Sequence, residues 1–236
     1  MGVNTYLKNE EEYVPWDSAL SNLNYIKRMF TRSGNYGALK NYLLTILTPL
    51  YESVGFQNSI NDPHLEQFKR VMALAWACNL EYQDCVNNSV SLYQKWMQNP
   101  TDHSIVSPNL KSTVYCTAIA AGGEKEWNFG WNQYLASNVG SEKSLLLYAL
   151  GCTKKVWILS RYLDMAFTDG SGIRKQDAVT VLSGVARNSV GHYLAWNYIR
   201  DKWEKIIDYY VSRLFTIPAL IEVVSECLNT DLELKE

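Results

Sequence analysis

The chain has 236 residues, of which 47% are hydrophobic and 19% charged, and its 22 Lys and Arg against 24 Asp and Glu give a formal net charge of −2 at pH 7. This balance excludes an intrinsically disordered chain and argues against a nucleic-acid partner, which needs a basic face. The 8 Trp, 16 Tyr and 6 Phe predict a large packed core or a buried interface. No apolar stretch is long enough to span a membrane, and residues 1–5 lack the basic and apolar segments of a signal peptide.

Helical periodicity runs through the chain, because apolar residues recur three or four positions apart. Asp17 or Ser18 is the expected cap of the first helix, and Pro63 after Asn61 and Asp62 marks another helix start. Glycine or proline ends most of the stripes, and residues 122–123 are expected to form a tight turn between two helices. The expected helices span residues 17–32, 39–54, 63–76, 86–98, 108–121, 124–137, 141–149, 156–166, 175–187, 190–210 and 218–228.

These segments predict an all-α fold of about eleven helices, with antiparallel pairs recurring at roughly 35–45 residues. We therefore expect residues 1–236 to form a single right-handed superhelix of the HEAT or armadillo type, an α-solenoid. A compact all-α bundle is the alternative, and the short turns within the pairs favour the solenoid.

Five cysteines are present, at Cys78, Cys85, Cys116, Cys152 and Cys227. Their spacing excludes a zinc finger, and one interpretation is five buried thiols in a cytosolic protein. Against it, Cys78 and Cys85 flank a short polar turn, where two Cα atoms can approach to about 6 Å, as a disulfide requires. Asn87 begins an N-glycosylation sequon directly afterwards. These two signals favour an extracellular protein.

The residues needed for several common chemistries are missing from the sequence. The three histidines, His64, His103 and His192, are far apart, and none belongs to the H-E-x-x-H motif of a zinc peptidase. Phosphate-binding glycine loops and the G-x-S-x-G nucleophile motif are absent as well. Taken alone, the sequence predicts a non-catalytic helical interaction domain, with no catalytic and no metal-ligating residues.

Several short stretches, taken together, resemble one family. They are residues 13–16 (YVPW), 96–100 (WMQNP), 108–116 (PNLKSTVYC), 121–127 (AGGEKEW), 157–163 (WILSRYL) and 173–177 (IRKQD), with Asn188, Gly191, Ala195, Trp196 and Trp203. From about residue 6 to residue 234 the chain resembles the ERAP1-like, C-terminal helical domain of the aminopeptidase N type in the M1 family of zinc aminopeptidases.

The resemblance implies that the chain is part of a larger, membrane-attached enzyme of the extracellular face, anchored elsewhere, for example by a GPI anchor. The zinc cofactor and the H-E-x-x-H motif would belong to a catalytic domain that this sequence lacks, and this chain itself would hold no cofactor. The implied role is to close the active-site chamber and control the access of peptides. The implied partners are the catalytic domain of the same protein and peptide substrates. Two alternatives are a docking module for a pore-forming toxin or a viral spike, and an unrelated cytosolic HEAT scaffold.

The resemblance also implies disulfides between Cys78 and Cys85 and between Cys116 and Cys152. Cys227 is left over, either as a buried thiol of the last helix or as a free thiol. We further expect Asn87 to carry a glycan.

The polar run Arg174, Lys175 and Gln176 is the candidate peptide-channel or interdomain site, because it stands where an apolar stripe would otherwise start. In one interpretation it is a solvated helix start, with Asp177 near the positive end of the helix dipole. In the other it lies on a concave surface that faces the catalytic domain and holds peptide backbone or carboxylates. Aromatic side chains from the region of Tyr193 or Trp196 are then expected nearby. Core packing is expected for five tryptophans, Trp96, Trp127, Trp157, Trp196 and Trp203.

Overall fold

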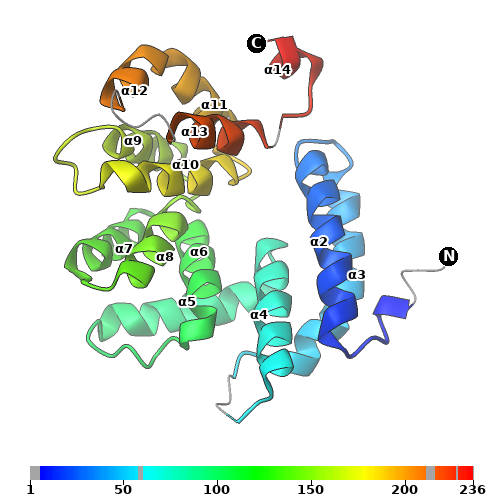
Figure 1. Ribbon diagram of the computed structural model, residues 1–236. Coiled ribbons are helices and arrows are strands. Elements are labelled where there is room, and N and C mark those ends of the chain that lie inside the picture. Colours follow the sequence, from blue (N-terminus) through cyan, green and yellow to red (C-terminus); the bar gives the residue numbers. More distant parts are fainter. Residues whose placement is uncertain (1–5, 58–60, 211–215, 227, 236) are drawn as a thin grey trace. The chain divides into compact units, whose positions relative to one another are not determined.

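The computed structural model describes residues 6–57, 61–210, 216–226 and 228–235, so that Cys227 lies outside the described residues. The predicted all-α fold is confirmed: within these ranges helix follows helix through short connections, as in an α-solenoid, and there is no strand (Figure 1). The chain divides into two compact units, Met1–Thr117 and Ala118–Glu236, which are taken in turn. None of the helices described is both long and apolar enough to cross a membrane.

The first unit is organised around one central helix. Its elements are α2 (Tyr13–Phe30), α3 (Tyr36–Val54), α4 (His64–Asn79), α5 (Gln83–Gln98), η1 (Pro108–Leu110) and the start of α6 (Lys111–Ala121). Helix α4 contacts α2, α3, α5 and η1. The expected helix start at Asp17 or Ser18 is wrong, because α2 already begins at Tyr13. Pro15 does not prevent this start, since backbone N–H groups of the first turn have no partner within the helix.

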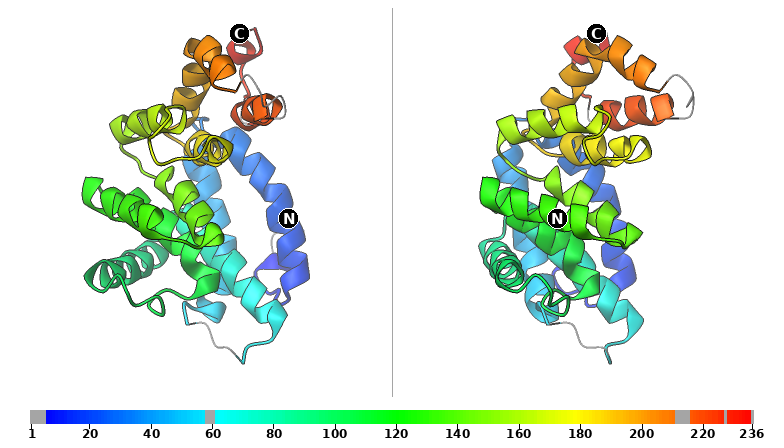
Figure 2. Two further views of the ribbon diagram at one scale, coloured as in Figure 1. Left: turned by 60° about the vertical axis from the view of Figure 1, so that its left-hand side comes forward. Right: turned by 90° about the vertical axis from the view of Figure 1, so that its left-hand side faces the viewer.

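The second unit is organised around α10, which contacts α8, α9, α11 and α13 (Figures 1 and 2). Its elements are the end of α6, α7 (Glu124–Ala136), α8 (Gly140–Leu150), α9 (Val156–Ala166), η2 (Lys175–Asp177), α10 (Ala178–Ala186), α11 (His192–Asp201), α12 (Trp203–Tyr209), α13 (Thr216–Ser225) and α14 (Asp231–Lys235). The single helix expected over residues 190–210 is wrong, because the chain breaks at Lys202 into α11 and α12. The apolar spacing continues across this break, which is why periodicity did not reveal it.

Two glycines of the second unit stand just outside helices, where the backbone of α10 comes very close. A Cβ atom at Gly151, just after α8, would lie 2.6 Å from the backbone carbon of Gly184 in α10. A Cβ atom at Gly191 would lie 2.4 Å from the Val185 carbonyl oxygen. Contacts this short do not occur between real atoms, so side chains at these positions would force the backbones apart. Gly191 is one of the residues that carry the family resemblance, and close packing explains why a glycine stands there.

The side chain of Asn188 joins the loops at the ends of these helices. Its Nδ2 donates hydrogen bonds to the carbonyl oxygens of Gly151, at 2.9 Å, and Thr153, at 2.7 Å. Its Oδ1 accepts a hydrogen bond from the backbone N–H of Val190, at 3.2 Å. The residue is buried, so these bonds satisfy backbone groups that water does not reach. Asn188 is one of the residues that carry the family resemblance, and its structural role is to form these hydrogen bonds.

The sequence predicted that five tryptophans are packed in the core, and the structure confirms this for only some of them. Trp96 and Trp127 are buried, at 3% and 2% exposure. Trp157 is 54% exposed, so the expectation was wrong for this residue. It lies on the helix face that carries Arg161 and Asp164, whereas the buried face of α9 begins at its neighbour Ile158. The tight turn expected at residues 122–123 is confirmed, since α6 ends at Ala121 and α7 begins at Glu124.

A disulfide joins the end of α4 to the start of α5. Cys78 and Cys85 are bonded, with their Cα atoms 5.1 Å apart, across the short turn that the sequence placed between two helices. Cys116 in the first unit is disulfide-bonded as well, and so is Cys152 in the second. The bonded cysteines fit an oxidising compartment.

We expect replacement of both Cys78 and Cys85 by alanine to lower the free energy of unfolding by about 2–3 kcal/mol, because the bond closes a short loop in the unfolded chain. Urea unfolding of the double variant and of the parent chain measures the difference. Mass mapping of unreduced peptides from the parent should recover the cross-linked pair. Equal unfolding midpoints, or free thiols at both positions, would contradict the prediction.

Candidate functional site

The polar run predicted as a site follows a loop that the second unit holds in place. Gly170 and Gly172 have φ angles of 77° and 97°, in the left-handed region that favours glycine. The hydroxyl of Tyr134, on α7, donates a hydrogen bond to the Gly172 carbonyl oxygen at 3.0 Å. Ile173 is buried next to it. The loop therefore has a defined conformation, and these contacts fix the position at which η2 and α10 begin.

Arg174 is exposed but paired. Its Nε and an Nη donate to the two carboxylate oxygens of Asp177, at 2.6 and 3.1 Å, and 60% of its side chain is exposed. The hydrogen bond from Asp177 raises the pKa of Arg174. Asp177 occupies the N-cap position of α10, where the positive end of the helix dipole favours a carboxylate. The guanidinium of Arg174 thus pairs mainly with the carboxylate at the start of α10.

Lys175 is held against α12 instead of projecting into solvent. Its Nζ lies 4.0 Å from the ring centroid of Tyr209 and donates to the Tyr209 carbonyl oxygen at 3.3 Å. A carboxylate oxygen of Asp169 is also 3.3 Å away. The hydroxyl of Tyr210 donates in turn to the Lys175 carbonyl oxygen at 2.7 Å. Of the three predicted residues, Gln176 is exposed without such ties to α12.

The aromatic neighbours of this segment come from α12, whereas the sequence pointed to the region of Tyr193 and Trp196. Tyr209 and Tyr210 pack edge to face, with ring centroids 5.1 Å apart, and both rings contact Phe167 at the end of α9. The hydroxyl of Tyr209 is buried and has no hydrogen-bond partner among the described residues. Burial and the charge of Asp169 raise the pKa of Tyr209, so this hydroxyl keeps its proton at neutral pH.

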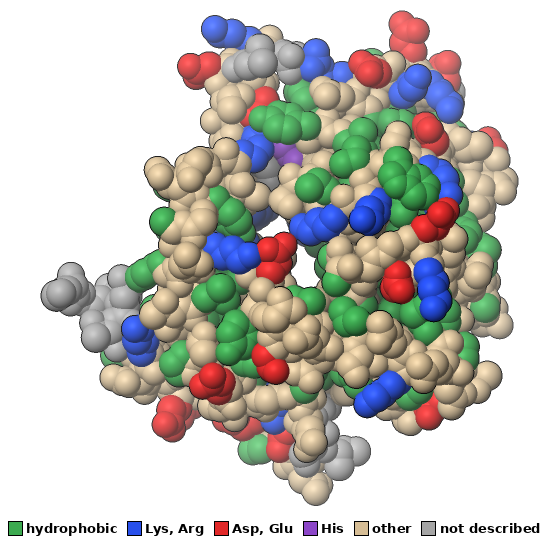
Figure 3. All heavy atoms as spheres, turned by 180° about the vertical axis from the view of Figure 1, so that it is seen from behind, with side chains coloured by type: hydrophobic (Ala, Val, Ile, Leu, Met, Phe, Trp, Pro, Cys, Tyr) green, Lys and Arg blue, Asp and Glu red, His purple; other side chains and the backbone are tan. Residues whose placement is uncertain are grey.

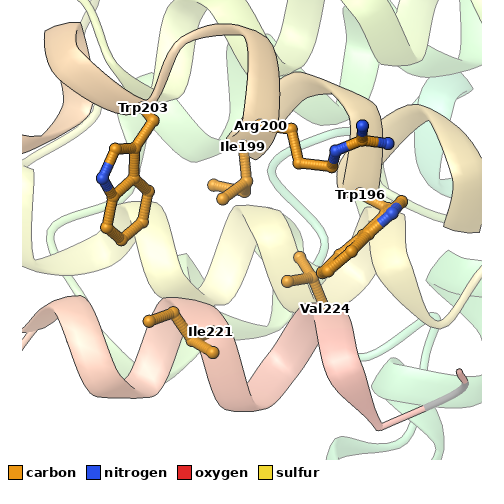
Figure 4. Close-up of a pocket in the computed structure, with 6 residues that line it drawn as sticks. All are labelled: Trp196, Ile199, Arg200, Trp203, Ile221 and Val224. Carbon is orange, nitrogen blue, oxygen red and sulfur yellow. The ribbon is translucent and has the colours of Figure 1, made fainter. Parts of the chain in front are cut away.

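An open apolar groove lies between α13 and the pair α11 and α12 (Figure 4). Its volume is about 420 Å³. The lining residues are Trp196, Ile199, Arg200, Trp203, Ile221 and Val224. The two indoles stand at either end of the groove with Ile199 between them, and Ile221 and Val224 form its other wall. The groove is suited to an apolar or aromatic group.

Arg200 adds one positive charge to the rim of this groove. Its guanidinium carbon lies 5.9 Å from the ring centroid of Trp196, and the residue is exposed. A guanidinium recognises a carboxylate through two parallel hydrogen bonds. Sequence reasoning assigned Trp196 and Trp203 to the core and so missed the groove, in which both are only partly buried. The spacing of Trp196, Ile199 and Trp203 along one face is the signal that marks it.

The charges on the surface are mixed. On the face drawn in Figure 3, basic and acidic side chains alternate, with hydrophobic side chains between them. This distribution agrees with the net charge of −2.

The histidines do not form a metal site in the part of the chain that is described. His64 begins α4 and is exposed, and His103 lies in the loop after α5. His192 is buried at the start of α11, with its Nε2 3.7 Å from a carboxylate oxygen of Glu233. Within the described ranges no three His, Cys, Asp or Glu side chains gather around a common point. The described histidines therefore do not supply the ligand set of a zinc site.

Asn87 lies on the exposed side of α5, two residues after Cys85, and its Oδ1 accepts a hydrogen bond from Gln83. Ser89, the hydroxyl residue of the sequon, is buried. We expect material from a secretory host to carry a glycan on Asn87, attached before Ser89 becomes buried. Peptide mass mapping before and after enzymatic deglycosylation checks this, with Asn87→Gln as the unmodified control. An unmodified Asn87 in such material would mean that α5 forms before the sequon is used.

The comparisons with known proteins agree over nearly the whole chain. Residues 2–236 match the family model of the ERAP1-like C-terminal domain. The chain is 40% identical to rat aminopeptidase N over 235 residues, and 38% identical to the human protein over 237 residues; both alignments cover 98% of this chain and 24% of the relative. Bovine glutamyl aminopeptidase is 33% identical over 236 residues, covering 99% of the chain and 24% of the relative. The chain thus spans about a quarter of the length of these relatives.

Proposed function

Because the chain belongs to the ERAP1-like C-terminal domain family, we propose that it is the C-terminal domain of a zinc aminopeptidase of the aminopeptidase N type. The observation that carries this proposal is the identity of about 40% to aminopeptidase N across 98% of the chain. In this proposal the zinc ion and the residues that cleave the peptide belong to a catalytic domain outside this chain. The enzyme is attached to the extracellular face of the plasma membrane through another part of the parent protein.

The domain itself is proposed to close the active-site chamber and to control which peptides enter it. Two features of the second unit support such a role. The groove of α11, α12 and α13 offers an apolar surface with Arg200 at its rim. The start of α10 offers Arg174 and Gln176, both exposed. Side chains of these kinds bind peptide backbone, peptide carboxylates or carboxylates of a neighbouring domain.

The proposal requires that activity depend on the catalytic domain. We expect the 236-residue chain to hydrolyse no aminoacyl-anilide with or without added zinc, and the complete protein to do so in a chelator-sensitive way. The coding sequence upstream of Met1 is expected to contain H-E-x-x-H. Chelator-sensitive turnover by the purified chain, or an upstream sequence without the motif, would overturn the proposal.

The access role is tested in the complete protein with Arg174→Ala. We expect turnover of long peptides to fall by a factor of about two to five while that of an aminoacyl-anilide is unchanged, since a single exposed ionic contact contributes little. Arg187→Ala is the matched control, because Arg187 also pairs with a carboxylate, that of Glu226, through two hydrogen bonds. Zinc content and the melting temperature serve as checks on folding. If long and short substrates are turned over as in the parent, Arg174 only stabilises the start of its own helix.

A further inference from the structure

A second cavity lies in the first unit, on the surface between α2 and α4, with a volume of about 270 Å³. Its lining combines an apolar wall with polar side chains. The residues are Asp17, Leu20, Ser21, Asn24, Lys27, Met72, Ala75, Trp76 and Asn79. Neither the family match nor the resemblance assigns a role to this cavity. It is open enough to admit a small molecule and presents one amine to it.

That amine, Nζ of Lys27, is partly buried and held by two neighbours. It donates a hydrogen bond to Oδ1 of Asn79 at 2.5 Å and lies 4.6 Å from the ring centroid of Trp76. Its hydrogen-bond acceptor is therefore an amide, not a carboxylate. An amide oxygen can accept a hydrogen bond from a neutral amine as well as from an ammonium ion, so this site does not require a charged lysine.

The burial of Lys27 and a neighbouring positive charge also favour its neutral form. Burial, and then the charge of Arg28, lower the pKa of Lys27 from 10.5 to about 8. The Trp76 ring acts in the opposite direction, since it attracts a cation. Asp17 also lines the cavity, but it precedes Lys27 by ten residues on the same helix, a rise of about 15 Å.

The helices packed against α2 carry charged groups with partners of their own. On α3, Lys40 pairs with Glu81. On α4, Lys69 pairs with Glu66 and Arg70 with Asp62. In the described part of the chain, no carboxylate of α2, α3 or α4 therefore pairs with Lys27.

We propose that Lys27 is a nucleophilic amine and that the cavity beside it is a covalent binding site for small aromatic aldehydes. The aldehyde's ring would pack on Trp76 and against Leu20 and Met72, which form the apolar wall. Its carbonyl carbon would then face Nζ.

The chemical step is the formation of an imine. The lone pair of the neutral Nζ attacks the carbonyl carbon, and the C=O π electrons move to oxygen, which takes up a proton. Nitrogen loses its two protons and the oxygen leaves as water, so that the C=N bond forms with no change in redox state. The reaction is reversible, and a hydride donor added in the experiment reduces the imine to a stable secondary amine.

Labelling of the purified chain tests the site. The chain is treated briefly with benzaldehyde and sodium cyanoborohydride, and each lysine is quantified by peptide mass mapping across a pH series. At pH 7.5 roughly a quarter of the Lys27 amines are neutral, against about 0.1% for an ordinary lysine. We expect Lys27 to react at least about tenfold faster than Lys40, because its lower basicity offsets only part of this advantage. Its rate should level off above pH 8, the pKa given by its surroundings, whereas that of an ordinary lysine continues to rise.

Lys40 is the matched internal control, since it is also partly buried but is bound to a carboxylate, Glu81, at 2.6 Å. Asn79→Asp places a carboxylate beside Nζ at an exposed position without changing the size of the side chain. It should slow labelling of Lys27 about tenfold and leave Lys40 unchanged, because a nearby negative charge favours the ammonium form. Propanal should show less preference for Lys27 than benzaldehyde does.

Two results would overturn the proposal. One is labelling of Lys27 at the rate of Lys40. The other is labelling of Lys27 that Asn79→Asp does not slow. If propanal and benzaldehyde label Lys27 with equal preference, the cavity does not bind the aromatic ring, and Lys27 is only a reactive amine.

Discussion

Replacement of Trp127 by alanine should lower the free energy of unfolding by about 3–5 kcal/mol, the range for truncating a large buried aromatic side chain. Trp127 is 2% exposed. Its Nε1 donates a hydrogen bond to the Leu150 carbonyl oxygen at 3.1 Å. Its ring lies 6.0 Å from that of Trp131 and 5.5 Å from that of Tyr162, measured between centroids. The alanine variant loses these contacts, leaves a cavity and deprives a buried carbonyl of its donor.

Trp157→Ala is the matched control for this prediction. Arg161 lies over both rings, with its guanidinium carbon 5.0 Å from the Trp127 centroid and 5.2 Å from that of Trp157. Trp157 is 54% exposed, so its loss should cost about 1 kcal/mol or less, the size of an exposed cation–π contact. Urea unfolding followed by circular dichroism measures both variants. Similar losses of unfolding free energy in the two variants would contradict the prediction that the buried ring contributes more than the exposed one.

Replacement of Asn188 by leucine should lower the free energy of unfolding by about 2–4 kcal/mol, since each buried polar group left without its partner costs about 1–3 kcal/mol. The variant leaves the carbonyl oxygens of Gly151 and Thr153 and the N–H of Val190 without the side chain that satisfies them. Leucine has nearly the same size, so the loss would come from hydrogen bonding and not from a cavity.

Two further variants test whether lost hydrogen bonds cause this destabilisation. Asn132→Leu changes an exposed asparagine on α7 and should alter the free energy of unfolding by less than about 0.5 kcal/mol. Asn188→Asp keeps the shape and the acceptor for Val190 but removes both N–H donors. It should therefore destabilise the chain at least as much as the leucine variant, because a carboxylate would face two carbonyl oxygens. An aspartate variant as stable as the parent would contradict the role of the two donated hydrogen bonds.

The helical fold and the family were both accessible from the sequence. Apolar residues at three- and four-residue spacing determine which segments become helices, because that spacing matches the helical turn. Glycine and proline signals marked most of the connections, including the turn at residues 122–123. The turn between Cys78 and Cys85 was visible in the same way, and the structure places a disulfide across it. These features are local, so a one-dimensional pattern suffices to find them.

The sequence alone could not show which side chains each helix brings to its neighbours. Trp127 and Trp157 both stand in helices of the second unit, yet only the packing of α9 through the face that begins at Ile158 leaves Trp157 exposed. The break at Lys202 is hidden by apolar spacing that continues from Trp196 to Trp203. Only the arrangement of α11, α12 and α13 turns these residues into the lining of a groove.

The polar contacts were decided by tertiary structure for the same reason. Arg174 pairs with a residue three positions away, but Lys175 meets Tyr209, and Lys27 meets Asn79, across tens of residues of sequence. The pKa of a lysine depends on its burial and on the charges that surround it in space, and Lys27 owes its lowered value to both. Periodicity determines the faces of each helix, whereas the energy of a polar side chain depends on which atoms another helix places beside it.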